Sequence, residues 1–194
     1  AYVRHRWTNI ESEGDANNEL FWEKEMRKLL SASVALAMMA TPVFAADVKL
    51  GIILGYTGPI ESLTPDMAMG AELAISEANE SGEFMSGTKI SSVRGDSTCI
   101  DSAAATAAAE RLITSDKINA MVGADCSGVT TAILQNVAMA NGVVMVSPSA
   151  TSPALSTIED NDLFFRTAPS DARQGEVVAD ILTEKGMMSA AMSY

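Results

Sequence analysis

The run Val48-Lys49-Leu50-Gly51-Ile52-Ile53-Leu54 decides the fold, because it is a dense apolar segment of strand length. Such a run is typical of a strand buried on both faces, as in a parallel sheet. The turn-rich sequence Gly55-Tyr56-Thr57-Gly58-Pro59 follows it, and Pro65-Asp66 then opens a segment with apolar residues at helical spacing. The sequence therefore predicts a strand, a loop and a helix, with Asp66 as the helix cap.

The same alternation continues along the chain. Further strands are expected at 89–93, 120–123, 143–146 and 164–166, and further helices at 101–115, 127–140 and 171–185. The apolar residues of 188–194 are expected to begin another strand. Strands that alternate with helices over short connections predict an α/β fold, with a doubly wound, mostly parallel sheet and helices on both faces.

The candidate ligand site lies in loops beyond the carboxyl ends of the strands, where open α/β sheets bind ligands. Besides the loop at 56–59, the segment 125–128 opens a helix, whose free N–H groups and dipole suit a carboxylate. Ser127 adds a hydroxyl there, and Ser149 and Thr151 offer hydroxyl and carbonyl groups that suit an ammonium. We therefore predict that Ser127, Ser149, Ala150 and Thr151 bind one zwitterionic ligand.

Each of these residues also has a purely structural alternative. Ser127 can be a helix N-cap and nothing more, and the stretch 147–152 can be only a turn. Asp125 is expected to be a solvated loop acid, which would repel a carboxylate.

Residues 26–45 have the pattern of a secretory signal peptide. Arg27 and Lys28 form a positive start, Leu29–Ala40 is apolar, and Val43-Phe44-Ala45 predicts cleavage after Ala45. The alternative is a membrane anchor, but the apolar run is shorter than the ~20 residues that span a bilayer. The polar residues 1–25 precede this signal, so we interpret them as a non-native upstream segment outside the fold.

Charge and composition exclude several classes of function. A net charge of −12 disfavours nucleic acid and anionic membranes as partners. One histidine and two cysteines are too few for a four-ligand zinc site, so no metal is expected. The chain carries no dinucleotide, phosphate-loop or nucleophile-elbow motif, and its only histidine, His5, lies in the upstream segment. We therefore expect no catalytic residue and no cofactor. The sequence predicts that the protein is not an enzyme.

Cys99 and Cys126 are the only cysteines of the chain. An export signal implies an oxidising compartment, which favours a disulfide between them. The alternative is a pair of buried, reduced thiols.

Several blocks occur in the order found in one known family. They are Gly58-Pro59, Gly70-Ala71-Glu72-Leu73-Ala74, Gly95-Asp96-Ser97-Thr98-Cys99, Val122-Gly123-Ala124-Asp125-Cys126-Ser127, Ser147-Pro148-Ser149-Ala150-Thr151-Ser152-Pro153 and the run from Phe165 to Gly175. Over residues 48–194 the chain resembles the leucine/isoleucine/valine-binding proteins, the type I periplasmic receptors of branched-chain amino acid ABC importers.

The resemblance implies two α/β lobes that close on a ligand, a disulfide between Cys99 and Cys126, and a zwitterion held by Ser127, the backbone of Ser149, and Thr151. It also implies a periplasmic monomer that delivers an amino acid to ABC permease subunits in the inner membrane. The first lobe would span 46–170, and 171–194 would begin a second lobe cut short at Tyr194. An aromatic residue near the mouth in some members is replaced by Leu63 here. Alternatives that keep the fold are receptors for amides, urea or aromatic acids, and the ligand-sensing domain of a signalling receptor.

Overall fold

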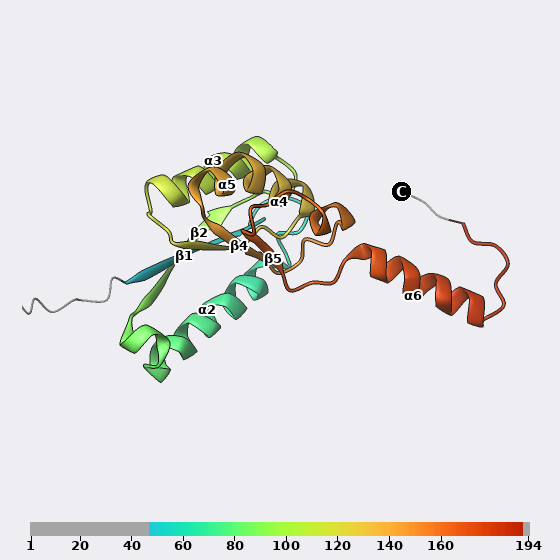
Figure 1. Cartoon of the computed structure of the whole chain (residues 1–194), viewed down its shortest axis with the longest axis horizontal. Coiled ribbons are helices and arrows are strands. Elements are labelled where there is room, and N and C mark those ends of the chain that lie inside the picture. The colour runs from blue at the N-terminus through green and yellow to red at the C-terminus, as the bar shows by residue number, and fades with distance from the viewer. Residues whose placement is uncertain (1–46, 192–194) are drawn as a thin grey trace, which may run out of the picture. The chain divides into compact units, whose positions relative to one another are not determined.

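The computed structural model describes residues 47–191 and contains a five-stranded parallel sheet. Its strands are β1 (Val48–Leu54), β2 (Ile90–Asp96), β3 (Ala120–Gly123), β4 (Val144–Ser147) and β5 (Phe164–Arg166). Their order is β2-β1-β3-β4-β5, and every neighbouring pair is parallel (Figure 1). The predicted doubly wound α/β fold is confirmed, and β1 has the bounds expected from its apolar run.

Helices cover both faces of the sheet, as predicted. On one face lies α2 (Thr64–Ser81). On the other lie α3 (Ser102–Thr114) and a continuous helical run made of α4 (Ser127–Ile133), a π-helical turn (Leu134–Ala138) and α5 (Met139–Asn141). The two-residue period of a strand explains how β1 serves both faces. Ile52 packs with Ala68 of α2, whereas Ile53 belongs to the larger core beneath α3 and α4.

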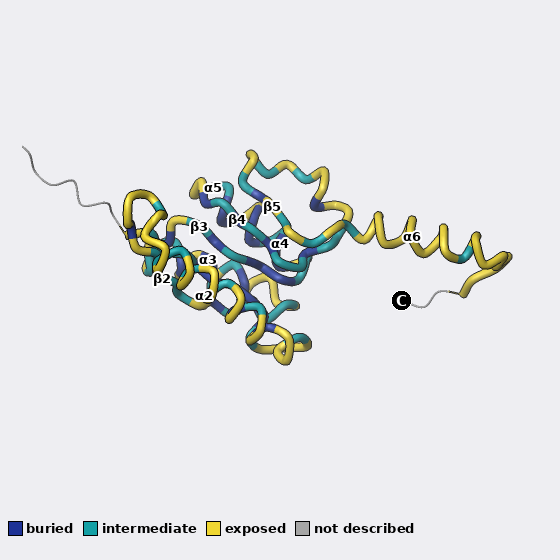
Figure 2. The backbone as a smooth tube through the Cα atoms, turned by 90° about the horizontal axis from the view of Figure 1, so that it is seen from below, coloured by how far each residue is buried: buried dark blue, intermediate teal, exposed yellow. Residues whose placement is uncertain are grey.

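The larger core is made almost entirely of aliphatic side chains, each at most 7 % exposed, and Figure 2 shows buried stretches along the strands. Ile133, Leu134, Val137 and Ala138 are all buried, as the helical period predicts. Ala105, Ala109 and Leu112 of α3 recur at three- and four-residue spacing, so one stripe of that helix faces the sheet.

The helices α2 and α3 begin in different ways. Asp101 caps α3, because its carboxylate accepts hydrogen bonds from the N–H groups of Ala103 and Ala104. Asp66 does not cap α2, which begins at Thr64; Leu63 occupies the cap position and makes no side-chain cap hydrogen bond. The prediction for Asp66 is wrong because Pro65 occupies the first turn, where a missing N–H group costs nothing, and Asp66 falls inside that turn.

The last described segment carries α6 (Asp171–Glu184), in which no residue is buried. Its apolar side chains Val177, Val178 and Ile181 are each more than a third exposed. The strand expected from residue 188 onward is not formed over 188–191, which have no regular structure, and 192–194 lie outside the described residues. A strand forms only where a neighbouring strand satisfies its backbone groups, and none of the described strands does so.

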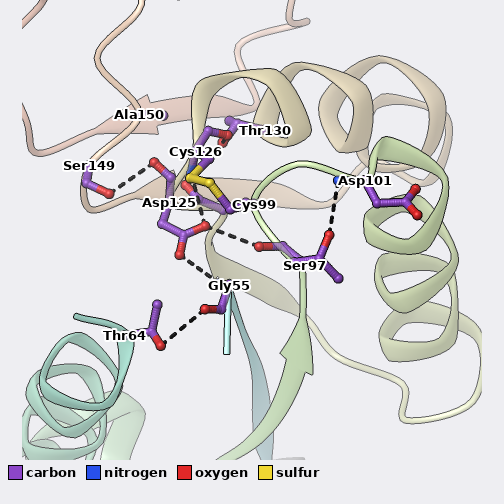
Figure 3. The surroundings of a disulfide bond; sticks show 12 residues. Gly55, Thr64, Ser97, Cys99, Asp101, Asp125, Cys126, Thr130, Ser149 and Ala150 are labelled. Carbon is purple, nitrogen blue, oxygen red and sulfur yellow. Dashed lines mark hydrogen bonds between the residues drawn. A yellow bond between two sulfur atoms is a disulfide. The ribbon is translucent and has the colours of Figure 1, made fainter. Parts of the chain in front are cut away.

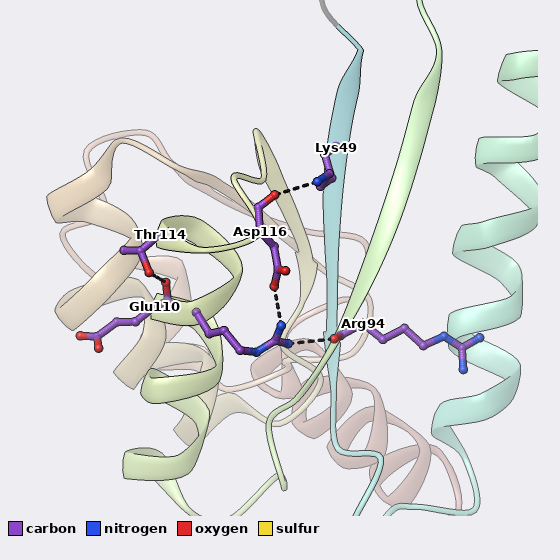
Figure 4. Close-up of polar contacts among 6 residues, drawn as sticks. Lys49, Arg94, Glu110, Thr114 and Asp116 are labelled. Carbon is purple, nitrogen blue, oxygen red and sulfur yellow. Dashed lines mark hydrogen bonds and ion pairs between the residues drawn. The ribbon is translucent and has the colours of Figure 1, made fainter.

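Polar contacts near the protein surface link β1 and β2 to the segment between α3 and β3 (Figure 4). The N–H of Lys49 donates to Oδ1 of Asn119 at 2.8 Å, and its Nζ donates to the carbonyl of Asp116 at 2.9 Å. Arg111 pairs with the carboxylate of Asp116 and donates to the carbonyl of Arg94 at 3.1 Å. The two bonds of Lys49 fix the start of β1 against the segment that leads into β3.

The signal peptide predicted at 26–45 and the upstream segment at 1–25 lie outside the described residues. Within the described part of the chain, no helix combines the length and the apolar character needed to cross a bilayer.

Candidate functional site

The strand order places a switch point at the carboxyl ends of β1 and β3. The chain runs from β1 to β2 on one side and then returns to β3 on the other, so the connections leave these two strands in opposite directions. Ligands of open α/β sheets bind at such a point, outside the carboxyl ends of the strands. Gly55 follows β1 there, and Ala124, Asp125 and Cys126 follow β3.

Asp125 is buried with 2 % exposed surface, so the prediction of a solvated loop acid is wrong. Its Oδ2 accepts from the N–H of Gly55 at 2.7 Å (Figure 3). Its Oδ1 accepts from the hydroxyl of Ser97 at 3.1 Å and from the N–H of Cys126 at 3.0 Å. A carboxylate can leave water only where hydrogen bonds replace its hydration, and these donors lie on loops that sequence spacing does not bring together.

The predicted disulfide between Cys99 and Cys126 is present, and no cysteine of the described chain is free. Cys99 follows β2, and Cys126 is the residue that precedes the first turn of α4 (Figure 3). The bond therefore ties the loop after β2 to the start of α4, the helix predicted to bind a carboxylate.

Ser127 is the first residue of α4 and not its cap, which is Cys126. The Ser127 hydroxyl accepts a hydrogen bond from the N–H of Ser152 at 3.1 Å. Within residues 47–191, the N–H groups of Ser127, Gly128 and Val129 donate to no protein acceptor. The start of α4 thus keeps the free N–H groups of a helix N-terminus and lies against the loop that follows β4.

Hydrogen bonds hold the loop after β4 beside the loop after β3. Ser149 donates its hydroxyl to the carbonyl of Asp125 at 3.0 Å (Figure 3). The hydroxyl of Ser147 donates to the carbonyl of Ala124 and accepts from the N–H of Ala150 at 2.9 Å. The structure therefore brings together Ser127, Ser149 and Ala150, three predicted ligand contacts from two segments more than twenty residues apart.

Thr151, the fourth predicted site residue, contacts the start of α6. Its hydroxyl donates to Oδ2 of Asp171 at 2.9 Å, and its carbonyl accepts from the N–H of Asp171 at the same distance. The Thr151 hydroxyl, predicted to face an ammonium, has a protein acceptor here.

Arg166, at the end of β5, was not selected from the sequence. Its guanidinium donates to the carbonyls of Ala150 and Ser152 at 3.1 and 2.9 Å and to the hydroxyl of Ser156. These hydrogen bonds hold the loop on both sides of Thr151. A lone arginine directly after Phe164-Phe165 could have pointed to this role, because a half-buried guanidinium needs several acceptors.

Asp96, at the end of β2, adds a further link between loops. It accepts from the hydroxyl of Thr57 at 2.6 Å and from the N–H of Thr98 at 2.9 Å. Burial acts to raise the pKa of Asp96, but the hydrogen bonds from Thr57 and Thr98 outweigh it and hold this pKa below the ordinary value. Asp96 is thus a charged group that stiffens the loop after β1.

The chain is similar in sequence and fold to proteins of one known family. Residues 66–194 match the family described as the receptor family ligand binding region. The chain belongs to this family. Its curated relatives include the Leu/Ile/Val-binding protein of Citrobacter freundii, 31 % identical over 82 % of this chain, and homolog 3 of that protein from Brucella melitensis, 37 % identical over 79 %. The resemblance indicated by the sequence blocks is confirmed.

Solved structures of the family share the fold. The branched-chain amino acid transporter substrate-binding protein LivJ of Streptococcus pneumoniae, in complex with isoleucine, is 31 % identical with a TM-score of 0.64. A solute-binding protein of an ABC transporter from R. palustris, in complex with benzoate, is 26 % identical with a TM-score of 0.63. The matches cover 72 and 73 % of this chain and 38 % of each solved chain. Likewise, the chain spans about 40 % of the length of the curated relatives it matches, at 42 and 40 %.

Proposed function

We propose that this chain supplies the first lobe of the substrate-binding receptor of an ABC importer, which captures a branched-chain or related amino acid. The receptor is not an enzyme: it binds its ligand between two lobes, and the closed form is the one that permease subunits recognise. The signal peptide predicted at 26–45 would deliver the receptor to the periplasm, where the complete protein acts as a monomer.

The observation that carries this proposal is the contact between the start of α4 and the loop after β4. The N–H of Ser152 bonds the hydroxyl of Ser127, and the hydroxyl of Ser149 bonds the carbonyl of Asp125. A helix N-terminus with free N–H groups attracts a carboxylate, while carbonyl and hydroxyl oxygens accept hydrogen bonds from an ammonium. Two such groups side by side suit the two charges that every free amino acid carries on one carbon.

A panel of ligands on the full-length protein tests the proposal. Leucine, isoleucine, valine, other amino acids, urea, short amides and benzoate would be added in excess, and the melting temperature measured for each. A ligand that binds only the folded state stabilises it by RT ln(1 + [L]/Kd), so a tight ligand gives a clear shift. We expect shifts with branched-chain amino acids. Shifts with none of the amino acids would refute the proposal.

Aromatic acids are the second candidate class, supported by the similarity to the R. palustris protein in complex with benzoate. A benzoate needs the helix N-terminus but no acceptor for an ammonium. A thermal shift with benzoate and none with leucine would favour this class, and it would keep the role of α4 while removing that of the loop after β4.

A further inference from the structure

Asp125 forms hydrogen bonds to more loops of the candidate site than any of the predicted ligand-binding residues does. Its side chain accepts from Gly55 after β1, from Ser97 after β2, and from Cys126 at the start of α4. Its backbone carbonyl accepts from Ser149 in the loop after β4. One residue therefore touches the ends of four neighbouring strands, as Figure 3 shows for its contacts with Gly55, Ser97 and Ser149.

The burial of Asp125 determines what these bonds do. With 2 % of Asp125 exposed, water cannot replace the hydrogen bonds of its carboxylate, so the protein donors must keep their positions. The N–H of Gly55 and the hydroxyl of Ser97 are buried as well, and each would be left unsatisfied if the carboxylate moved. The arrangement is therefore stiff, and it sits directly before the free N–H groups of α4.

We propose that Asp125 is a positioning residue for ligand binding, which sets the start of α4 against the loop after β4. It does not contact the ligand in this scheme. It fixes Cys126 from one side while its own carbonyl holds Ser149 from the other. The proposal rests on the proposed function for its effect on affinity, but its structural part makes a prediction about the ligand-free protein too.

The variant Asp125→Asn tests the role with little change in shape. An asparagine has one acceptor oxygen and one NH₂ group, so either Gly55 or the pair Ser97 and Cys126 would face a donor. We expect leucine to bind about tenfold more weakly in the full-length protein, measured by calorimetric titration. Ser97→Ala removes a single donor and leaves the carboxylate in place, and it should weaken binding by about threefold.

Asn119→Ala is the matched control. Asn119 precedes β3 as Asp125 follows it, and its Oδ1 also accepts a backbone N–H of the β1 segment, that of Lys49. This bond lies at the amino ends of the strands, away from the predicted site. We expect Asn119→Ala to lower the free energy of unfolding but to leave the Kd for leucine unchanged.

The amide of Ser152 provides a readout that needs no ligand. It bonds Ser127 and not Asp125, so its hydrogen exchange reports whether α4 and the loop remain together. Under conditions where all variants are folded, Asp125→Asn should speed this exchange at least tenfold and Asn119→Ala should not.

Two results would overturn the proposal: a folded Asp125→Asn protein with the wild-type Kd, or wild-type exchange at Ser152 in that variant. If Asp125→Asn does not fold, the same measurements on Ser97→Ala decide. A wild-type protein that binds no member of the ligand panel would contradict the proposed function instead, and the exchange experiment would still decide the role of Asp125.

Discussion

The two ends of the central strand pair use the same kind of bond under different conditions. At the amino ends, the amide oxygen of Asn119 accepts from Lys49, and Asn119 is exposed. At the carboxyl ends, the carboxylate of Asp125 accepts from Gly55 in a buried setting. Water can replace the exposed amide oxygen of Asn119, so losing this bond affects only its surroundings. Water cannot reach the buried carboxylate of Asp125, so this group holds the ends of four strands in place. The proposed ligand site lies at the end where buried polar groups fix the backbone connections.

The disulfide gives the largest test of this difference, because it lies wholly at the carboxyl end. Replacing both Cys99 and Cys126 by serine should lower the free energy of unfolding by about 3–4 kcal/mol, since a cross-link over a 27-residue separation restricts the unfolded chain. Urea denaturation of the oxidised protein and the double variant measures it. Thiol labelling of the unfolded, unreduced protein should find no free cysteine, and two labelled thiols would disprove the pairing.

A pair of glycine substitutions compares the two ends of the sheet through the backbone. Gly123 ends β3 with φ +125°, and an added Cβ would lie 2.0 Å from the carbonyl oxygen of Ile53. Gly123→Ala should therefore cost about 3 kcal/mol or more. Gly142 precedes β4 at the amino end with φ +64° and open space around it, so Gly142→Ala should cost only about 1–2 kcal/mol. Equal losses in thermal denaturation would contradict the contrast.

Two threonine variants compare the ends through affinity. Thr151→Ala in the full-length protein should weaken ligand binding by about 1–3 kcal/mol, because the loop loses its bond to Asp171 and a polar group of the predicted site. Thr88→Ala removes a buried hydroxyl that bonds the carbonyl of Met85 before β2. It should lower stability and leave the calorimetric Kd unchanged. An unchanged Kd in Thr151→Ala would remove that residue from the site.

The smallest effect is expected from acid. The pKa of Asp96 in the folded protein lies below its ordinary value of 3.8, so Asp96 stabilises the fold above that pH. This contribution is lost as the pH falls from about 3.8 through the folded-state pKa. The variant Asp96→Asn should therefore be less stable than wild type at about pH 6, by less than about 1 kcal/mol, and the gap should narrow as the pH falls below 3.8. Urea titrations at several pH values measure this difference in unfolding free energy. A difference that grows as the pH falls would contradict a lowered pKa of Asp96 in the folded protein.

Local chemistry was sufficient to predict much of the structure. The apolar run at 48–54 and the helical period at 127–140 predict their elements because burial depends on side chains that are near neighbours in the sequence. Ser127, Ser149 and Ala150 could also be predicted as neighbours, since parallel strands bring their carboxyl ends to one edge. A predicted export signal only favours a bond between the two cysteines, whereas the family resemblance implies this specific pairing.

The tertiary structure alone decided how those loops are held. Asp125 looks like an ordinary loop acid in the sequence, and its burial follows from donors on Gly55 and Ser97, 70 and 28 residues away. Arg166 and Asp171 acquire roles in the same way, through carbonyl and hydroxyl groups of the loop after β4. Periodicity and propensity report what a residue prefers among its close neighbours, whereas the environment of a polar side chain depends on which distant segments the fold places around it.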